Sequence, residues 1–177
     1  ADVVLRAVTA RGVVGVNADR LSISRCSFTG NRWDVGVLLT DGGGQTVESS
    51  DFSDHLCAIR ALRTTGTVIR HNTIEARWWG VHLDRTEDAH VHGNHMRATM
   101  RAVDVDGGTN ALIDGNAASG GDSGCIVERG AAHCTVNGNH WERCRIGLLA
   151  WDAVDLDRRD NVCVDLHEPD GADIAGP

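Results

Sequence analysis

The sequence has no lysine, no tyrosine, and only two prolines and two phenylalanines among its 177 residues. All 17 basic side chains are therefore arginines, and 25 acidic side chains outnumber them to give a net charge of −8. A basic surface of the kind that binds nucleic acid is missing, and electrostatic capture of a polyanion is disfavoured unless a cation bridges it to the protein. No apolar run is long enough to cross a bilayer. We therefore expect neither a nucleic-acid partner nor a membrane partner.

Cysteine pairs with the C-x-x-C spacing are also absent, although the chain contains six cysteines. They are Cys26, Cys57, Cys125, Cys134, Cys144 and Cys163. Isolated cysteines are typical of small apolar core residues with free thiols, and a disulfide framework is the alternative. Free thiols favour a cytoplasmic location, whereas a secreted chain would already have lost the signal peptide, which is not visible at the start.

What the sequence does contain is a repeat of 22 residues, interrupted once by a spacing of 23. One ladder consists of asparagines, namely Asn72, Asn94, Asn116, Asn139 and Asn161. A second ladder of glycine or alanine runs in phase with it, namely Gly36, Ala58, Gly80, Ala102, Gly124 and Gly147. Both ladders gain their extra residue in the same coil, between Glu128 and Val136. Self-similarity at this period predicts a solenoid.

Each small residue is followed by a segment in which apolar and other residues alternate. The positions predicted to face inward are Val37, Ile59, Val81, Val103, Cys125 and Leu148, and then Leu39, Ala61, Leu83, Val105, Val127 and Ala150. The positions between them, predicted to point out, are Leu38, Arg60, His82, Asp104, Ile126 and Leu149. A second segment, with an inward residue such as Ile69 or Val91, precedes each asparagine. The alternation predicts short strands, each paired in parallel with its counterpart one coil away.

The asparagine ladder has a physical purpose of its own. Asparagine tolerates the left-handed backbone angles of a bend, and stacked asparagines pass amide hydrogen bonds from rung to rung. The same position holds Cys26 and Ser50 in the earlier coils. We therefore expect this device to be absent from the first coils.

The phrase TVIRHNTIEARWWGVHLD, residues 67–84, contains the two recurring motifs x-V-x-x-N-x-ϕ and G-V-x-L. These motifs resemble the parallel β-helix family of pectate-lyase-like solenoids, which includes polysaccharide lyases, uronan epimerases, and carbohydrate-binding and sugar-hydrolysis domains. The resemblance spans nearly the whole chain and implies a single all-β domain over residues 1–177. That domain would be a right-handed parallel β-helix of about seven coils. Residues 1–20 would form an imperfect first coil, and residues 164–177 a polar tail in a loop conformation.

Stacking in register would bring together charged residues that lie far apart in the sequence. One outward column contains Arg60, His82 and Asp104. The column beside it contains the carboxylates of Asp84, Asp106 and Glu128. Carboxylates stacked about 5 Å apart resist joint ionisation. An arginine, raised pKa values or a bound cation must compensate, and Ca²⁺ takes oxygen ligands of this type.

The resemblance and these columns together predict a carbohydrate-active lyase or epimerase that removes a proton next to the carboxylate of a uronic acid. His82 would be the base, and Arg60 or Ca²⁺ would stabilise the enolate-like intermediate, with Asp104 in the same catalytic column. Trp78 and Trp79 would stack on sugar rings, although an aromatic at a coil corner is more often a packing plug.

A second outward cluster lies on the strand that precedes the asparagine. His92 is flanked there by Arg70 and Asp114, which is the pattern of a second acid/base or substrate-binding site, and we count Arg70 and His92 among the substrate-binding candidates. His90 and His92 also form a His-x-His pair, which can grip zinc or copper.

Other interpretations remain open. The charged columns are also typical of a solvated sheet face. The chain would then be a non-catalytic β-helix that binds a glycan or a partner protein. A fold of this kind can also be recruited for isomerisation or cyclisation of a small-molecule acid. The aspartate-proline-histidine motif of alginate epimerases and the glycine-histidine-glycine motif of polygalacturonases are both missing. The open ends of a solenoid would allow homo-oligomers.

Overall fold

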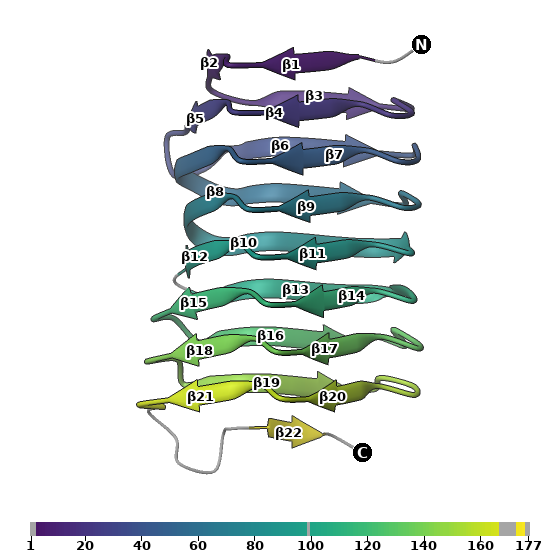
Figure 1. Cartoon of the computed structure of the whole chain (residues 1–177), viewed down its shortest axis with the longest axis vertical. Coiled ribbons are helices and arrows are strands. Elements are labelled where there is room, and N and C mark those ends of the chain that lie inside the picture. Colours follow the sequence, from purple (N-terminus) through teal and green to yellow (C-terminus); the bar gives the residue numbers. More distant parts are fainter. Residues whose placement is uncertain (1–2, 99, 167–172, 176–177) are drawn as a thin grey trace.

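The computed structural model describes residues 3–98, 100–166 and 173–175. Every element in these ranges is a strand, and the strands stack coil upon coil in a parallel β-helix that runs from the N-terminal end to the C-terminal end (Figure 1). None of the described residues forms a helix that is long and apolar enough to span a membrane. The all-β parallel solenoid predicted from the 22-residue repeat is confirmed.

One sheet contains eight strands, each contributed by the segment before the asparagine position. In spatial order they are β1 (Val4–Arg6), β4 (Ser22–Ser24), β7 (Thr46–Glu48), β9 (Val68–Arg70), β11 (His90–His92), β14 (Leu112–Asp114), β17 (Thr135–Asn137) and β20 (Asp157–Arg159).

The other sheet contains 14 strands, because two segments of each coil pair within it. The segments after the asparagine position are β2 (Thr9–Ala10), β5 (Ser27–Thr29), β12 (His95–Ala98), β15 (Ala117–Ser119), β18 (His140–Glu142) and β21 (Val162–Val164). The segments after the small residue are β3 (Val13–Val16), β6 (Val35–Thr40), β13 (Arg101–Thr109), β16 (Ser123–Glu128), β19 (Ile146–Trp151) and β22 (Asp173–Ala175). In β8 (Asp51–Leu62) and β10 (Thr73–Glu87) both segments form one strand that continues around the corner.

The core is the interior of the coils, as the alternation predicts. Ile59, Val81 and Val103 are neighbours in parallel register and are completely buried. Sterics explain why glycine occupies positions 80 and 124 of the small-residue ladder. A Cβ atom at Gly80 or Gly124 would lie 2.6 Å from a carbonyl oxygen of the next coil. Close stacking of the coils therefore depends on these small residues.

The asparagines form a single buried file. The backbone N–H and the side-chain Nδ2 of Asn72 both donate to Oδ1 of Asn94 at 3.0 Å, and Asn94 repeats this arrangement with Asn116. Nδ2 of Asn72 also donates to the carbonyl oxygen of Val47 at 3.0 Å. Each side chain thus pairs backbone groups that the bend would otherwise leave without partners.

Amide-to-amide bonds are absent from the earlier coils, as expected from Cys26 and Ser50, but the file of acceptors continues into those coils. The backbone N–H of Ser50 donates to Oδ1 of Asn72 at 3.0 Å, and the Ser50 hydroxyl oxygen accepts from the backbone N–H of Cys26 at 3.1 Å. A hydroxyl oxygen can replace the amide oxygen, because the bend needs only one acceptor for the next N–H.

The extra residue lies where the two ladders place it. Asp106 and Glu128, 22 residues apart, are in register, whereas Thr109 and Ala132, 23 residues apart, are in register on the far side of the bend. The insertion therefore falls in the bend after Glu128, and the strands on either side keep their alignment.

The C-terminal tail differs in part from the predicted loop. Within residues 164–177, the segment Asp173–Ala175 forms β22, which pairs in parallel with β19. The reason is the free edge of β19, whose backbone groups would otherwise lack partners. Residues 167–172 and 176–177 lie outside the described residues.

None of the six cysteines, all of which lie among the described residues, forms a disulfide bond, as the absence of C-x-x-C pairs suggests. Five are buried and Cys163 is half-buried. Burial raises the pKa of Cys57 to about 12 and that of Cys144 to about 11. These thiols therefore stay protonated at neutral pH and act as small apolar side chains.

Candidate active site

The residues predicted to form a catalytic column are neighbours on consecutive strands. His82 on β10 pairs in register with Arg60 on β8 and with Asp104 on β13. Asp84 and Asp106 form the adjacent column, which continues to Glu128 on β16. The 22-residue period alone accounts for this alignment, because it superimposes equivalent positions of successive coils.

The catalytic column is buried, however, and the sequence did not indicate this burial. His82 is 8% exposed and Asp104 is 1% exposed, although both point away from the core. The ring of Trp79 stacks on the imidazole of His82, with centroids 5.2 Å apart and planes 21° apart. Nη1 of Arg101 lies 2.7 Å from Oδ2 of Asp104. Trp79, which follows the irregular stretch of β10, and Arg101, the first residue of β13, therefore form a roof over the outer face of the sheet.

The roof and the sheet line a cavity of about 370 Å³ that is partly open to solvent, and we call it the His82 cavity. Its lining includes the whole predicted catalytic column, the three predicted metal-binding carboxylates, and both Trp78 and Trp79. Sequence reasoning missed Met100, Arg101 and Arg129, which also line it. The sequence signal that could have identified them is their position at or next to the ends of the aligned strands β13 and β16.

Arginines neutralise the carboxylates of the cavity. The pairs are Arg60 Nη2 with Asp84 Oδ2 (3.0 Å), Arg85 Nε with Asp84 Oδ1 (2.9 Å), Arg129 Nη1 with Asp106 Oδ2 (2.6 Å), and Arg101 Nη1 with Glu128 Oε1 (2.9 Å). Burial raises the pKa of Asp84, but the hydrogen bonds from Arg85 and Arg60 outweigh it and hold that pKa below its usual value. The repulsion expected between stacked carboxylates is thus relieved by guanidinium groups.

This pairing bears on the predicted calcium site. Asp84, Asp106 and Glu128 supply oxygen atoms of the kind that Ca²⁺ takes, but each is held by at least one arginine. A cation would have to displace those guanidinium groups, so the residues fit a calcium ion poorly. Calcium binding at these carboxylates remains a prediction.

Four polar atoms buried in the cavity lining have no hydrogen-bond partner among the described residues. They are Arg60 Nε, Trp79 Nε1, His82 Nε2 and Asp104 Oδ1. A buried polar atom without a partner costs about 1–3 kcal/mol, and native proteins hold few of them. Their concentration around one cavity indicates a site arranged for something other than stability.

Burial also sets the protonation of the two central groups. It lowers the pKa of His82, and the guanidinium of Arg60 acts in the same direction, although the nearby carboxylate of Asp104 opposes it. Burial raises the pKa of Asp104 in spite of the Arg101 guanidinium. The imidazole is therefore neutral near pH 7, and the Asp104 carboxyl group keeps its proton to a higher pH than an exposed aspartate.

Two of the predicted substrate-binding residues lie elsewhere. Arg70 on β9 and His92 on β11 belong to the eight-stranded sheet, and Nε of Arg70 donates to Oε2 of Glu48 at 2.7 Å. In their coils, Arg70 and His92 come before the bend that holds the asparagine, whereas Trp78 and Trp79 come after that bend. The structure therefore brings only the two tryptophans to the His82 cavity.

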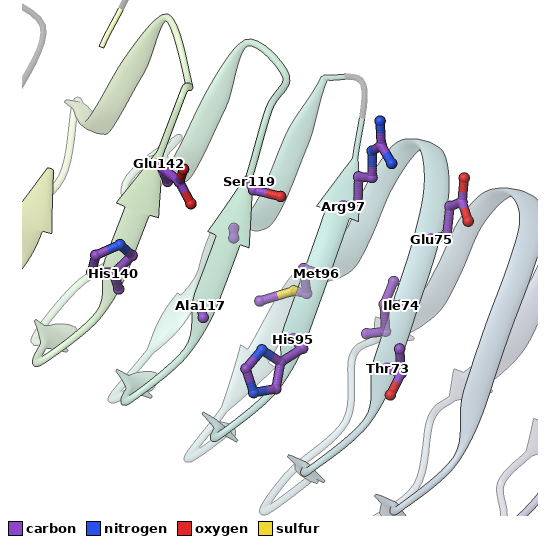
Figure 2. Close-up of a pocket in the computed structure, with 11 residues that line it drawn as sticks. Thr73, Ile74, Glu75, His95, Met96, Arg97, Ala117, Ser119, His140 and Glu142 are labelled. Carbon is purple, nitrogen blue, oxygen red and sulfur yellow. The ribbon is translucent and has the colours of Figure 1, made fainter. Parts of the chain in front are cut away.

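A second hollow lies on another face of the 14-stranded sheet (Figure 2). Its volume is about 390 Å³. His95, Ala117 and His140 are in register on consecutive strands, and Ser119 is in register with Glu142. The side chains of Ala117 and Ser119 are short, so the strand that carries them leaves a notch between its larger neighbours. We call this the Ala117 groove.

The comparison with protein families agrees with this architecture. The family described as "Right handed beta helix region" matches residues 11–162. The match covers most of the sequence, and the chain belongs to this right-handed β-helix family. The predicted handedness and family are thereby confirmed. No protein among the curated sequences matches the chain.

Proposed function

We propose that the His82 cavity is the active site of a carbohydrate-active enzyme. Its reaction is removal of the proton next to the carboxylate of an acidic sugar, as in a lyase or an epimerase. The observation that carries the proposal is the neutral, buried imidazole of His82 beside Asp104, whose pKa is raised by burial, within a cavity lined by arginines and tryptophans.

His82 acts as the base. Nε2 has no hydrogen-bond partner among the described residues, so its lone pair or proton is free for a substrate. Because the pKa of His82 is lowered by burial, the imidazole is unprotonated near neutral pH. Oδ2 of Asp106 lies 4.0 Å from Nε2 and stabilises the imidazolium that forms when the proton is taken.

The arginines bind the substrate carboxylate and stabilise the charge that develops on it. Nε of Arg60 is buried and lacks a partner among the described residues, so this guanidinium retains a donor for a substrate oxygen. Arg101 forms ion pairs with both Asp104 and Glu128 and lines the His82 cavity together with Arg60. A guanidinium matches the geometry of a carboxylate and of the enolate-like intermediate derived from it.

Asp104 supplies the acid. In a lyase reaction, the C–H electrons form a double bond as the C–O bond to the leaving sugar breaks, and Asp104 gives its proton to that oxygen. In an epimerase reaction, Asp104 is the candidate to return a proton to the same carbon. Both roles require a carboxyl group that keeps its proton, and burial favours this state.

The tryptophans form the sugar-binding wall. Trp78 is 44% exposed and meets Trp79 edge to face, with ring centroids 5.3 Å apart. Trp79 in turn covers His82. A sugar ring stacked on Trp78 would therefore lie at the mouth of the cavity. Nε2 of His82 is buried, so entry of the substrate requires this roof to move.

The test is turnover of uronic acid polymers and oligomers. A lyase forms an unsaturated product that absorbs ultraviolet light, and an epimerase exchanges the proton for solvent deuterium. We expect H82Q and R60Q each to lower the rate by about 10²–10⁴-fold, and H95Q in the Ala117 groove to leave it unchanged. The proposal is wrong if the wild type shows neither reaction, or if folded H82Q retains full activity.

The Ala117 groove favours a second candidate, a non-catalytic glycan-binding protein. It is open and lined by His95, Arg97, His140 and Glu142, which offer polar contacts to hydroxyl and carboxylate groups. A binder of this kind would lose glycan affinity in R97A and keep it in H82Q. The size of the His82 cavity also suits a small-molecule acid, so small hydroxy and keto acids belong in the same substrate screen.

A further inference from the structure

Two histidines and one aspartate gather on the outer surface of the eight-stranded sheet, away from the His82 cavity. His90 and His92 are two residues apart on β11 and therefore point to the same side. Their rings stack with centroids 4.3 Å apart. Oδ1 of Asp114 on β14 lies 2.6 Å from Nε2 of His90. One ligand atom from each of the three residues lies within 4.8 Å of the others, and no other such trio occurs among the described residues.

We propose that His90, His92 and Asp114 bind a divalent transition-metal ion, for which Zn²⁺ is the probe. Two imidazoles and one carboxylate are a donor set that zinc takes when it keeps a fourth position open. Calcium and magnesium prefer oxygen ligands alone, so this site differs in chemistry from the carboxylate column of the His82 cavity.

The geometry requires only small side-chain adjustments. Zinc binds nitrogen and oxygen ligands at about 2.0–2.2 Å, so two ligand atoms of a tetrahedral site lie about 3.3–3.5 Å apart. The three atoms already lie within 4.8 Å of one another. The hydrogen bond between His90 and Asp114 already brings two of the three ligand atoms to 2.6 Å from each other. The metal would replace the shared proton, since metal ligands must be deprotonated.

The surroundings tolerate the added positive charge. Arg70 is the nearest neighbour of His92 in register on β9, but its Nη2 atom lies 2.6 Å from Oε2 of Glu48, which neutralises it. The ring of His71 meets the ring of His92 edge to face at 5.0 Å and restricts its orientation. The side chains of His90 and Asp114 are 35% and 36% exposed, so an ion reaches them from solvent and a water molecule has room to complete the site.

The sequence pattern placed Asp114 beside His92, but the side chains pair differently. His92 and Asp114 are in register, yet Asp114 reaches diagonally to His90. The carboxylate thereby lies close to both imidazoles, which is what converts a His-x-His pair on a strand into three converging ligands. The ion would link two adjacent coils of the folded chain, so its binding should stabilise the native state.

The experiment is Zn²⁺ titration of the metal-free full chain by calorimetry, with melting temperature as a second readout. We expect one ion per chain, a melting temperature that rises with zinc concentration, and at least a tenfold loss of affinity in each of H90Q, H92Q and D114N. The matched control is H140Q, a surface histidine on the other sheet, which should bind zinc like the wild type. Far-UV circular dichroism shows whether each variant is folded.

A second measurement does not depend on any variant. Cu²⁺ follows the same donor preferences and binds such sites at least as tightly, and its electron paramagnetic resonance spectrum reports bound nitrogens. The proposal predicts hyperfine coupling to two imidazole nitrogens. It is overturned by a wild type that binds no zinc, by zinc affinity that falls as much in H140Q as in H92Q, or by a copper spectrum without nitrogen coupling. Displacement of zinc by excess Ca²⁺ would equally contradict it.

Discussion

The indole ring of Trp79 lies nearly parallel to the imidazole ring of His82, with 5.2 Å between the centroids and 21° between the planes. This contact removes His82 from solvent, although the residue points away from the core of the solenoid. Burial is the largest influence on the pKa of His82 and lowers it. The side chain of Trp79 thus contributes to the burial that lowers the pKa of the candidate base.

The first prediction concerns this contact. Trp79→Ala should expose His82 and raise its pKa toward the usual value near 6.5, because the desolvation of the charged form is relieved. The pKa is measured from the ring proton signals of His82 in an NMR pH titration. Trp151→Ala is the control, since Trp151 is 56% exposed and lies outside the lining of the cavity. Equal His82 pKa values in W79A and the wild type would refute this role of Trp79.

The second prediction concerns stability in mild acid. His55 is completely buried and packs closely against Gly30, where an added Cβ atom would lie 2.4 Å from the Nδ1 atom of His55. Burial lowers the pKa of His55 in the folded state, although the carboxylates of Asp34 and Asp54 oppose the shift. The unfolded chain, with a pKa near 6.5, then binds a proton that the folded chain does not.

The sign of the effect follows from this difference. The free energy of unfolding should be highest above pH 6.5 and fall below it, with a limiting slope of about 1.4 kcal/mol per pH unit for each such histidine. Urea denaturation between pH 7.5 and pH 5 measures the slope. His55→Leu should reduce this slope by about 1.4 kcal/mol per pH unit, the contribution of one proton. His133→Gln, at an exposed position, should leave the slope unchanged. An unchanged slope in H55L would show that another group governs the acid response.

The third prediction concerns the asparagine file. Asn94→Ala removes the acceptor of the Asn72 backbone N–H and the donor to the carbonyl oxygen of Ile69. Both groups are buried, so we expect the free energy of unfolding to fall by about 2–4 kcal/mol. Asn137→Thr, on the half-buried outer side of β17, should change it by less than about 0.5 kcal/mol. Chemical denaturation of both variants distinguishes the ladder from ordinary surface asparagine.

The fourth prediction concerns calcium. Because arginines hold Asp84, Asp106 and Glu128, neither CaCl₂ nor a calcium-selective chelator should change the melting temperature of the zinc-free wild type. Arg101→Gln removes the guanidinium shared by Asp104 and Glu128. In that variant the carboxylates repel one another, and Ca²⁺ should raise the melting temperature. A clear calcium response of the wild type would instead support the calcium site expected from the stacked carboxylates.

The repeat predicted the vertical relationships well, since a constant period makes residue i and residue i+22 neighbours. The alignment of Arg60, His82 and Asp104 and the file through Asn94 both follow from it. It did not predict that Ser50 extends the file. It also did not predict that Asp104 is inaccessible to solvent. The alternation shows which residues point outward, but it does not show which side chains cover them.

The sequence by itself determined the solenoid, the register of its coils and the identity of the stacked columns. The reason is that a constant period of buried residues fixes which positions of successive coils lie next to one another. Only the tertiary structure decided that Trp79 and Arg101 roof His82 and Asp104, and that Asp114 reaches His90 while Arg70 stays with Glu48. Those outcomes depend on bend conformation and on competition among nearby charges, which act in three dimensions and leave no periodic trace in the chain.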